Sequence, residues 1–479
     1  MIPISKNEIL ARLRFDNPWW KEGTIEQRFD SLPRRNYYSL FYDLVVDHSV
    51  NRAIVLMGPR RVGKTVIVYH AISELLKNGV EGVNILYLSL ETPVYTGLSL
   101  ENIVTTYLDI HNHTRDSRLF IFYDEVQYHK NWEVHLKSLV DSFPEFRFVA
   151  TGSAAAALRL KSQESGAGRF TDFLLPPLTF GEYLKFISQS DELPYIKNSE
   201  EDYTRYVTMD IEGLNRHFVD YLNFGGYPEA VFSETIKQDP ARFIKSDIID
   251  KVLLRDLPNL YGVNDIQELN KLFTVIAYNT GQEISLEELS QGAGISKNTL
   301  KRYLEYLEAA FLIKIVKRID GCAKKFKRVT RFKVYLVNPS MRAALFGPVT
   351  SDGAAMGALT ETGIYAQWFH SSAIDNLFYA RWKKGEVDIV HLMSSTQTPD
   401  WCVEVKWSDL PFYDNRKLGS VVEFAKANQL PECILITTKT VEGKKTVNGI
   451  DLEFMPSALY AYSLSENIQK NIERLSFVS

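Results

Sequence analysis

Residues 52–79, RAIVLMGPRRVGKTVIVYHAISELLKNG, decide the fold of the N-terminal part of this chain. An apolar run leads into a loop that starts at Gly58, and a helical stretch follows Thr65 and ends at Gly79. This spacing is typical of a phosphate-binding loop between a strand and a helix. Small residues let backbone N–H groups approach a phosphate, and the helix N-terminus adds its dipole. A chance match is the alternative, and the flanking strand and helix argue against it.

A second half of this site lies in residues 118–126, RLFIFYDEV, an apolar run that ends in two acids. We expect Lys64 to reach the β- and γ-phosphates of ATP and the Thr65 hydroxyl to hold Mg²⁺. Asp124 is expected to support Mg²⁺ from its outer coordination sphere, and Glu125 to polarise the attacking water. An acidic pair can instead cap a helix, but the upstream loop favours the nucleotide site. The predicted binding residues are Gly58, Pro59, Arg60, Arg61, Val62, Gly63, Lys64, Thr65, Val66 and Asp124.

Two more apolar runs, residues 83–91 and 146–153, complete an alternating strand and helix pattern that predicts a parallel sheet. The run 83–91 lies between the two halves of the site in the chain. An inserted strand of this kind, together with a catalytic glutamate, favours a hydrolysing NTPase over a nucleotide kinase. Ser153, at the end of the second run, is a candidate sensor of the γ-phosphate or of the attacking water. An ordinary helix N-cap explains Ser153 almost equally well, so both interpretations stay open.

A different pattern occurs in residues 401–409, WCVEVKWSD, where two opposite charges interrupt an apolar strand. Side chains alternate along a strand, so Glu404 and Lys406 are predicted to share one face while Val403 and Val405 point to the other. The run KGEVDIVHL, residues 384–392, is predicted to pair with this strand. This hairpin would bring the acid Asp388 close to the first two charges.

Two interpretations of this hairpin remain open. In the first, Asp388 and Glu404 hold a divalent ion such as Mg²⁺, and Glu361, on a predicted helix in ALTETGIYAQWF, binds a second ion or orients a water. Lys406 would then position the nucleophile or stabilise developing charge on a scissile phosphate. In the second, Lys406 merely neutralises acids on a solvated face.

Residues 285–338 predict a helix, a turn, a second helix and a hairpin, which is the order of a winged helix. Ser285 and Glu288 are spaced as a capping box. Nine Lys or Arg residues and one Asp lie between residues 314 and 333, and more basic residues begin the second helix. This local positive charge predicts nucleic-acid binding through residues 297–333. A nucleotide-linked lid or a protein contact is the alternative.

Together these motifs resemble prokaryotic AAA-type ATPases that carry a C-terminal domain of unknown function with a nuclease-like pattern. The matching stretches between about 58 and 338 are GPRRVGKT, YDEVQ with NWEVHLKSLVD, TGS, GRFTDFLLPPLTFGEYL, GGYPEAV and YLEYLEAAFLI, and GEVDIV and EVKWS extend the resemblance over nearly the whole chain. It implies a PD-(D/E)XK nuclease-like core, which can keep its fold after losing cleavage. It also implies that Arg169 reaches the nucleotide of a neighbouring subunit, although a plain surface arginine fits as well. Thr362 departs from the family pattern, which often has Asn there.

The 479 residues suffice for several domains, and the net charge of −4 gives no global attraction to nucleic acid. Three scattered cysteines and no membrane-length apolar run favour a cytoplasmic protein. We expect an α/β fold with a P-loop ATPase core, a helical lid, a winged helix and a restriction-nuclease-like α/β domain. The predicted boundaries are 1–50 for an N-terminal extension, 51–180 for the ATPase, 181–280 for the lid, 281–344 for the winged helix and 345–479 for the nuclease-like domain.

The sequence thus predicts an ATP-hydrolysing protein, able to form homo-oligomers, that couples its nucleotide state to nucleic-acid binding. Metal-dependent cleavage by the C-terminal domain is one predicted outcome, and a role in genome defence follows only by analogy. The first alternative is an ATPase that remodels a protein partner without cleaving nucleic acid. The second is a nucleotide-gated switch that binds DNA or protein and hardly turns over.

Overall fold

The computed structural model describes residues 5–476 apart from residues 96, 154–167, 189–195, 199–204, 264, 326–329 and 431–433. The chain forms two compact units. The first comprises residues 1–176 and 471–479, and the second comprises residues 177–470. The stretch predicted as an N-terminal extension is therefore part of the first unit.

The first unit is built on a five-stranded sheet in the order β2-β3-β4-β1-β5, and its strand pairs are all parallel. Strand β4 lies between β1, which leads into the loop, and β3, which ends at Asp124. Strands β1 to β4 are buried along most of their length, as expected for a sheet covered on both faces, whereas the edge strand β5 is buried only at Phe173. Their bounds are β1 Ala53–Met57, β2 Ile85–Ser89, β3 Phe120–Asp124, β4 Arg147–Gly152 and β5 Phe170–Leu174.

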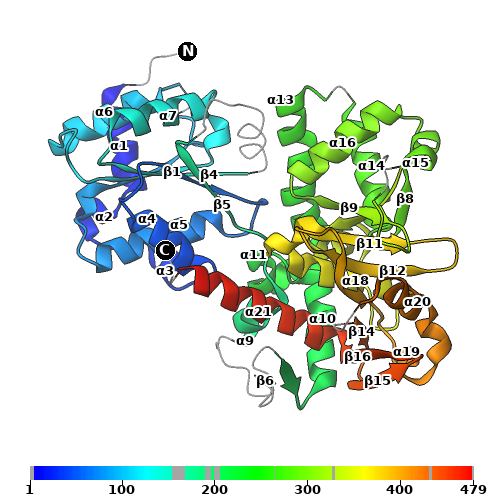
Figure 1. Cartoon of the computed structure of the whole chain (residues 1–479). Helices are drawn as coiled ribbons and strands as arrows, with labels where there is room; N and C mark the ends of the chain where they lie inside the picture. Colours follow the sequence, from blue (N-terminus) through cyan, green and yellow to red (C-terminus); the bar gives the residue numbers. More distant parts are fainter. Residues whose placement is uncertain are drawn as a thin grey trace. The chain divides into compact units, whose positions relative to one another are not determined.

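Helices lie on both faces of this sheet. Figure 1 shows α6 and α7 on one side of β1 and β4, and α4 and α5 on the other. The helix that follows the glycine-rich loop, α5, begins at Lys64 and has Asn78 as its C-cap, one residue before the predicted stop at Gly79. The helices of this unit are α1 Lys6–Asp16, α2 Trp19–Glu22, α3 Gln27–Asp30, α4 Tyr38–Val46, α5 Lys64–Lys77, α6 Leu100–His111 and α7 Trp132–Ser142, with short 3₁₀ turns η1 Gly82–Asn84 and η2 Val126–Tyr128.

The second unit contains a nine-stranded sheet in the order β15-β16-β14-β13-β12-β11-β9-β10-β8. The strands of the predicted wing, β9 and β10, pair with each other, and β9 also pairs with β11 in parallel. One sheet therefore continues across the predicted boundary between residues 344 and 345. The bounds are β8 Glu283–Ser285, β9 Ile313–Ile319, β10 Arg331–Leu336, β11 Leu377–Arg381, β12 Glu386–Leu392, β13 Pro399–Glu404, β14 Ile434–Thr438, β15 Gly443–Val447 and β16 Ile450–Pro456.

The region predicted as a helical lid is mainly helical and also contains a two-stranded sheet, β6 Ile196–Asn198 with β7 Tyr206–Thr208. Two consecutive stretches, η4 and η5, are π-helical. The helices up to residue 309 are α9 Phe180–Ser188, α10 Ile211–Phe224, α11 Pro228–Phe232, α12 Glu234–Gln238, η4 Ala241–Asp250, η5 Val252–Asp256, α13 Leu257–Tyr261, α14 Ile266–Tyr278, α15 Leu286–Ala293 and α16 Lys297–Ala309.

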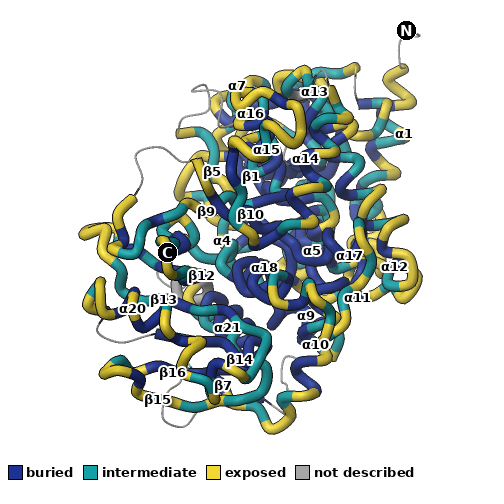
Figure 2. The backbone as a smooth tube through the Cα atoms, turned by 90° about the vertical axis from the view of Figure 1, so that its right-hand side faces the viewer, coloured by how far each residue is buried: buried dark blue, intermediate teal, exposed yellow. Residues whose placement is uncertain are grey.

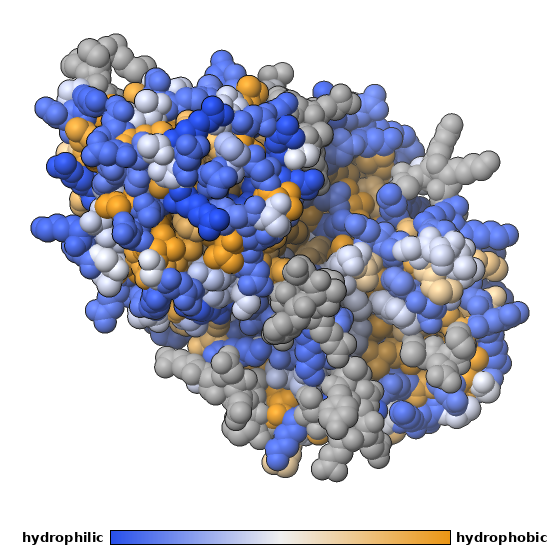
Figure 3. Space-filling view, turned by 60° about the vertical axis from the view of Figure 1, so that its left-hand side comes forward, coloured by the Kyte–Doolittle hydropathy of each residue, from blue (hydrophilic) through white to orange (hydrophobic). Residues whose placement is uncertain are grey.

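The core of this unit packs around α18, which is buried along most of its length in Figure 2. Apolar residues of α9, α10 and the inner sheet face surround it, and a separate apolar cluster lies under α20. No helix among the described residues is both long and apolar enough to cross a membrane. The face drawn in Figure 3 is mainly hydrophilic, with apolar residues in small groups. The remaining helices are α17 Ser340–Phe346, α18 Met356–Trp368, η6 Ser372–Asn376, α19 Leu410–Tyr413, η7 Asn415–Leu418, α20 Gly419–Asn428 and α21 Ser457–Ser476.

Candidate functional site

The glycine-rich loop runs from the end of β1 to the start of α5, at the carboxyl edge of the parallel sheet. Gly63 precedes the helix with a φ of 95°, in the left-handed region that favours glycine. A Cβ at Gly58 would lie 2.2 Å from the carbonyl oxygen of Leu175, so only glycine fits there. The Lys64 Nζ donates to the carbonyls of Gly58 (3.1 Å) and Pro59 (2.8 Å), which keeps the ammonium group inside the loop.

Asp124 ends β3 beside this loop and accepts three hydroxyl hydrogen bonds. Thr65 Oγ1 and Tyr87 OH each donate to Asp124 Oδ2 at 2.9 Å, and Thr151 Oγ1 donates to Oδ1. Burial and the neighbouring Glu125 raise the pKa of Asp124, while these hydroxyl groups act in the opposite direction. The Thr65 hydroxyl and the Asp124 carboxylate thus form a pair of hard oxygen donors at the helix N-terminus, a donor set that suits Mg²⁺.

Glu125 is held by a second set of contacts that sequence reasoning did not include. Its backbone has a φ of 57°, and its N–H donates to Thr151 Oγ1 at 3.1 Å. The Gln127 side chain donates through Nε2 to Glu125 Oε2 and accepts through Oε1 from the backbone N–H of Ser153 at 3.3 Å. Gln127 therefore links the candidate base to the end of β4. Its place two residues after Glu125, in YDEVQ, is the signal that could have found it.

Ser153 lies where a sensor of the γ-phosphate is expected, at the carboxyl end of β4, which lies between β3 and β1 in the sheet. Its side chain is fully buried, and its Oγ has no hydrogen-bond partner among the residues that the structure describes. A buried hydroxyl without a partner is unfavourable unless a ligand or water meets it. The residues that follow, from 154, lie outside the described range, so an N-cap role stays a prediction.

Arg35 supports the loop from the N-terminal segment. The side chain is buried, and its two terminal nitrogens donate to the carbonyls of Val62 (2.6 Å) and Pro176 (2.9 Å). The preceding residue, Arg34, instead pairs with Glu74 at 2.7 Å on the surface. The sequence assigns neither arginine a role, because nothing local distinguishes the buried arginine from its exposed neighbour.

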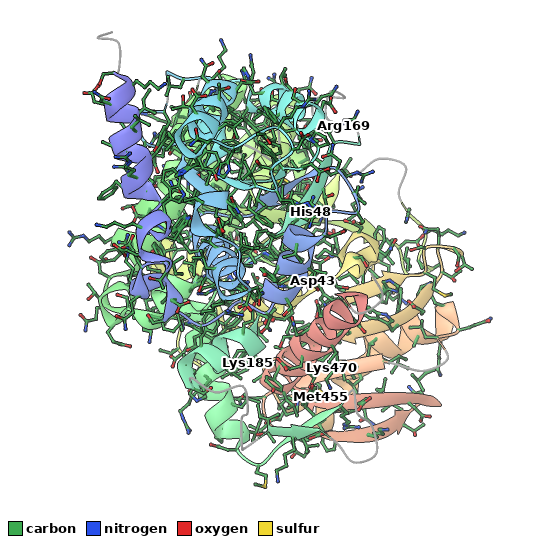
Figure 4. All side chains as sticks on the ribbon, turned by 90° about the vertical axis from the view of Figure 1, so that its left-hand side faces the viewer. Asp43, His48, Arg169, Lys185, Met455 and Lys470 are labelled. Atoms are coloured by element: carbon green, nitrogen blue, oxygen red, sulfur yellow. The ribbon has the colours of Figure 1, made fainter. Side chains whose placement is uncertain are left out.

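Arg169 lies at the opposite edge of the sheet from the loop. It precedes β5, and its backbone carbonyl accepts from Ala53, the first residue of β1. The length of β1, about 13 Å at the usual rise per residue, separates this edge from the loop. Its half-exposed side chain pairs with Asp141 and lies at the surface in Figure 4. Arg169 is therefore too far away to contact the nucleotide of its own chain.

The C-terminal candidates converge in one buried charge cluster. Lys406 Nζ contacts Asp388 Oδ2 at 3.2 Å and Glu404 Oε1 at 2.8 Å, and the backbone N–H of Val405 donates to Asp388 at 2.9 Å. Thr437 Oγ1 and Ser457 Oγ both donate to the carbonyl of Lys406, which fixes the backbone there. The alternative interpretation placed these acids on a solvated face. That placement is wrong, because the Asp388 and Glu404 side chains are only 8% and 12% exposed.

The cluster contains a second lysine, Lys333, that sequence reasoning assigned to the basic wing. Its Nζ lies 2.8 Å from Glu361 Oε1, 2.7 Å from Glu386 Oε1 and 3.2 Å from Asp388 Oδ1, and its side chain is 3% exposed. Tyr335, two residues along the same strand, donates to Glu361. A lysine in a basic run is normally a surface residue, so the local sequence gave no signal for this contact.

Burial changes the protonation of the cluster. It raises the pKa of Glu361 to about 7 and that of Glu404 to about 8, and the Asp388 charge adds to both effects. Asp388 itself would also be raised by burial, but Lys406 and Lys333 hold its pKa well below the usual value. The two lysine ammonium groups thus face an ionised Asp388 and the partly exposed Glu386. They also face Glu361 and Glu404, which hold protons near neutral pH.

The described residues contain no group of three or more His, Cys, Asp or Glu side chains placed to hold a metal ion. Glu361, Asp388 and Glu404 meet through the two lysines and not around one point. Their role as metal ligands stays a prediction. Thr362, the departure from the family pattern, is buried and hydrogen-bonds to Thr280 at 2.9 Å.

The predicted nucleic-acid surface is formed in part. Ser296 caps α16 through the backbone N–H of Thr299, and the side chains of Asn298, Lys301 and Arg302 are exposed on its first turns. Ser285 caps α15 at 3.4 Å. In the hairpin, several basic side chains pair within the unit, and residues 326–329, including two of the basic ones, lie outside the described range. The pairs are Lys314 with Glu308, Arg318 with Glu283, and Arg331 with Glu283 and Glu288.

The loop between β1 and α5, the acids that end β3 and the strand β4 between them define the first unit as a P-loop nucleotide-binding domain of the hydrolysing type. Residues 50–184 match the family model described as an AAA domain. This match supports an AAA-type ATPase domain in residues 50–184. Residues 215–352 match a model described as a domain of unknown function.

The chain is also similar to three uncharacterized proteins. Two are from Methanocaldococcus jannaschii, with 25% identity over 375 residues (76% of this chain and 77% of the relative) and 24% identity over 389 residues (77% and 80%). The third is from Haemophilus influenzae, with 26% identity over 299 residues, covering 61% of this chain and 69% of the relative.

Solved structures of a replication initiator resemble part of the chain at low similarity. The initiator DnaA bound to AMPPCP and single-stranded DNA has 15% identity and a TM-score of 0.28, covering 57% of this chain and 86% of that chain. AMPPCP-bound DnaA from Aquifex aeolicus has the same identity and TM-score, covering 60% and 92%.

Proposed function

We propose that this chain is a Mg²⁺-dependent ATPase whose nucleotide state controls binding of nucleic acid by residues 297–333. The observation that carries the ATPase part is the convergence of Lys64, Thr65, Asp124 and Glu125 on one edge of the sheet. Each of these side chains is positioned by contacts that do not need a ligand. The site is therefore organised before ATP arrives, which lowers the cost of binding and of reaching the transition state.

The chemistry follows from these positions. The loop N–H groups and the α5 dipole bind the phosphates, and Lys64 leaves the carbonyls of Gly58 and Pro59 to meet the β- and γ-phosphates. Thr65 and Asp124 would hold Mg²⁺, which neutralises charge on the phosphates. Glu125 accepts a proton from water as the new bond to the γ-phosphorus forms and the bond to the bridging oxygen breaks. The products are ADP and inorganic phosphate.

Exposed cations on α16 support the nucleic-acid part of the proposal. Lys301 and Arg302 lie on the first turns of the second helix of a helix-turn-helix pair, the end that commonly reaches the major groove. The internal ion pairs of Lys314, Arg318 and Arg331 reduce the charge that the hairpin offers. This observation favours a second candidate, in which the same surface contacts a protein partner and ATP hydrolysis remodels it.

The test is binding of labelled DNA and RNA to the full chain, with and without ATP, over a range of salt concentrations. We expect Lys301→Gln/Arg302→Gln to weaken binding at least tenfold and to reduce the salt slope by about 2, because about one counterion is released per phosphate contact. The matched control is Lys383→Gln/Lys384→Gln, which removes two exposed charges elsewhere on the same unit. Equal effects of the two double variants, or no binding by the wild type, would favour the protein partner.

A further inference from the structure

The nuclease-like pattern implies a divalent ion at Glu361, Asp388 and Glu404, and the geometry of the cluster allows that idea to be tested. Mg²⁺ requires an octahedral set of oxygen ligands around one point. Here the facing oxygens already contact ammonium groups: Glu361 Oε1 and Asp388 Oδ1 contact Lys333, while Asp388 Oδ2 and Glu404 Oε1 contact Lys406. The residues present do not fit a metal without displacement of a lysine.

One carboxylate oxygen of this cluster remains open. Glu404 Oε2 is buried and has no hydrogen-bond partner among the described residues. A single oxygen is not a divalent site, because Mg²⁺ needs about six oxygen ligands. Both oxygens of Asp388 and the other oxygen of Glu404 already contact the lysines.

We propose that the Lys333 ammonium group takes the place of a divalent cation, so that the C-terminal centre is a metal-free ionic core that does not cleave nucleic acid. The Lys333 ammonium group lies between Glu361 and Asp388, where a second ion bound through Glu361 would lie. Lys406 lies between Asp388 and Glu404, the predicted ligands of the first ion. Lys333 brings a positive charge to its position permanently, from the chain itself.

Lys333 is paired with three carboxylates. Its Nζ donates hydrogen bonds to Glu361 Oε1 at 2.8 Å and Asp388 Oδ1 at 3.2 Å, and it forms an ion pair with Glu386 Oε1 at 2.7 Å. A lysine that is buried this deeply is strongly destabilising unless it is fully paired, so these contacts hold it in place. Tyr335 donates to Glu361 from the same face of β10 and stacks on Tyr365 with ring centroids 4.3 Å apart.

The same contacts give the cluster a structural task. Lys333 is on β10 and Asp388 is on β12, and β9 and β11 lie between these strands in the sheet order. A direct ion pair across two strands requires the sheet to coil strongly on this face. The ion pair between Lys333 and Asp388 therefore links the β9–β10 hairpin, which includes residues 314–333, to strand β12 of the same sheet. Position 333 contributes rigidity to the proposed binding surface and no exposed charge.

The experiment measures Mn²⁺ binding by calorimetry to the nucleotide-free full chain, so that the P-loop site stays empty of its ATP-linked metal. We expect the wild type and Asp388→Asn to bind Mn²⁺ with the same stoichiometry. Lys333→Ala should bind one additional Mn²⁺, because it frees oxygens of Glu361 and Asp388. The double variant Lys333→Ala/Asp388→Asn should lose that additional ion.

A parallel assay incubates the wild type with labelled single- and double-stranded DNA and RNA, Mn²⁺ and ATP, and we expect no cleavage. Mn²⁺ binding or cleavage by the wild type that disappears in Asp388→Asn would overturn the proposal. A folded Lys333→Ala that gains no Mn²⁺ would also overturn it. If Lys333→Ala does not fold, the comparison of the wild type with Asp388→Asn decides the question alone. Loss of ATPase activity affects none of these outcomes.

Discussion

The two adjacent arginines of the N-terminal segment allow a sharp test of how the ATP loop is supported. Arg35→Ala leaves the buried carbonyls of Val62 and Pro176 without their charged donor. A hydrogen bond to a charged group is worth about 1.5–3 kcal/mol, so we expect the free energy of unfolding to fall by about 3 kcal/mol or more. For a unit of this size that corresponds to a fall of about 6–12 °C in Tm. ATP binding should weaken too, because Val62 is part of the loop.

Arg34→Ala is the matched control. Arg34 makes an exposed ion pair with Glu74 and lies over the Tyr38 ring at 4.2 Å. Exposed contacts of these kinds contribute about 1 kcal/mol together, or about 2–4 °C in Tm. Scanning fluorimetry with and without ATP would measure both variants. Equal shifts for Arg34→Ala and Arg35→Ala would refute the role assigned to Arg35.

Three further predictions concern the two sites. Lys64→Ala should weaken ATP binding at least tenfold in a fluorescent-nucleotide titration, with little change in Tm of the ligand-free protein; unchanged affinity would contradict the phosphate contact. Arg169→Ala, mixed with Glu125→Gln, should recover hydrolysis if Arg169 acts across a subunit boundary, whereas full activity of a strictly monomeric Arg169→Ala protein would exclude that role. Glu404 faces Asp388, Lys406 and Lys333, and its pKa is raised to about 8 from an ordinary 4.5, so the folded chain holds a proton that the unfolded chain has lost. The Tm of the wild type should therefore fall as the pH rises from about 5 to 9, and the Tm of Glu404→Gln should fall less. Equal decreases in Tm for the two proteins would show that Glu404 does not retain the proton.

The nucleotide site could be predicted from the sequence because its parts are local. Residues from Ala53 to Lys77 form a strand, a loop and a helix in one continuous stretch. Asp124 and Glu125 stand at the end of a later buried strand, β3. The order of the strands in the sheet could not be predicted from the sequence. The strand that separates β1 from β3 in the sheet is β4, although β2 lies between them in the chain. Gln127 was quoted within a motif, but its bridge between Glu125 and Ser153 depends on that strand order.

The C-terminal cluster could be predicted only in part. Alternation along two strands brought Asp388 and Glu404 together, and Lys406 joined them as expected. Lys333 is 55 residues away from Asp388 in the chain and lies in a basic stretch that predicts a surface. Only the tertiary fold turns that position inward. Cys402, two residues before Glu404 on the same strand, is fully buried in the apolar cluster that includes residues of α20.

The central claim is that Glu125 activates water for ATP hydrolysis at the loop site. The most direct measurement compares steady-state phosphate release by the wild type and Glu125→Gln in saturating ATP and Mg²⁺, with ATP affinity measured on the same samples. The predicted result is an unchanged affinity and a kcat at least about 100-fold lower, the usual loss when a general base is removed. Turnover of Glu125→Gln at the wild-type rate would contradict the account.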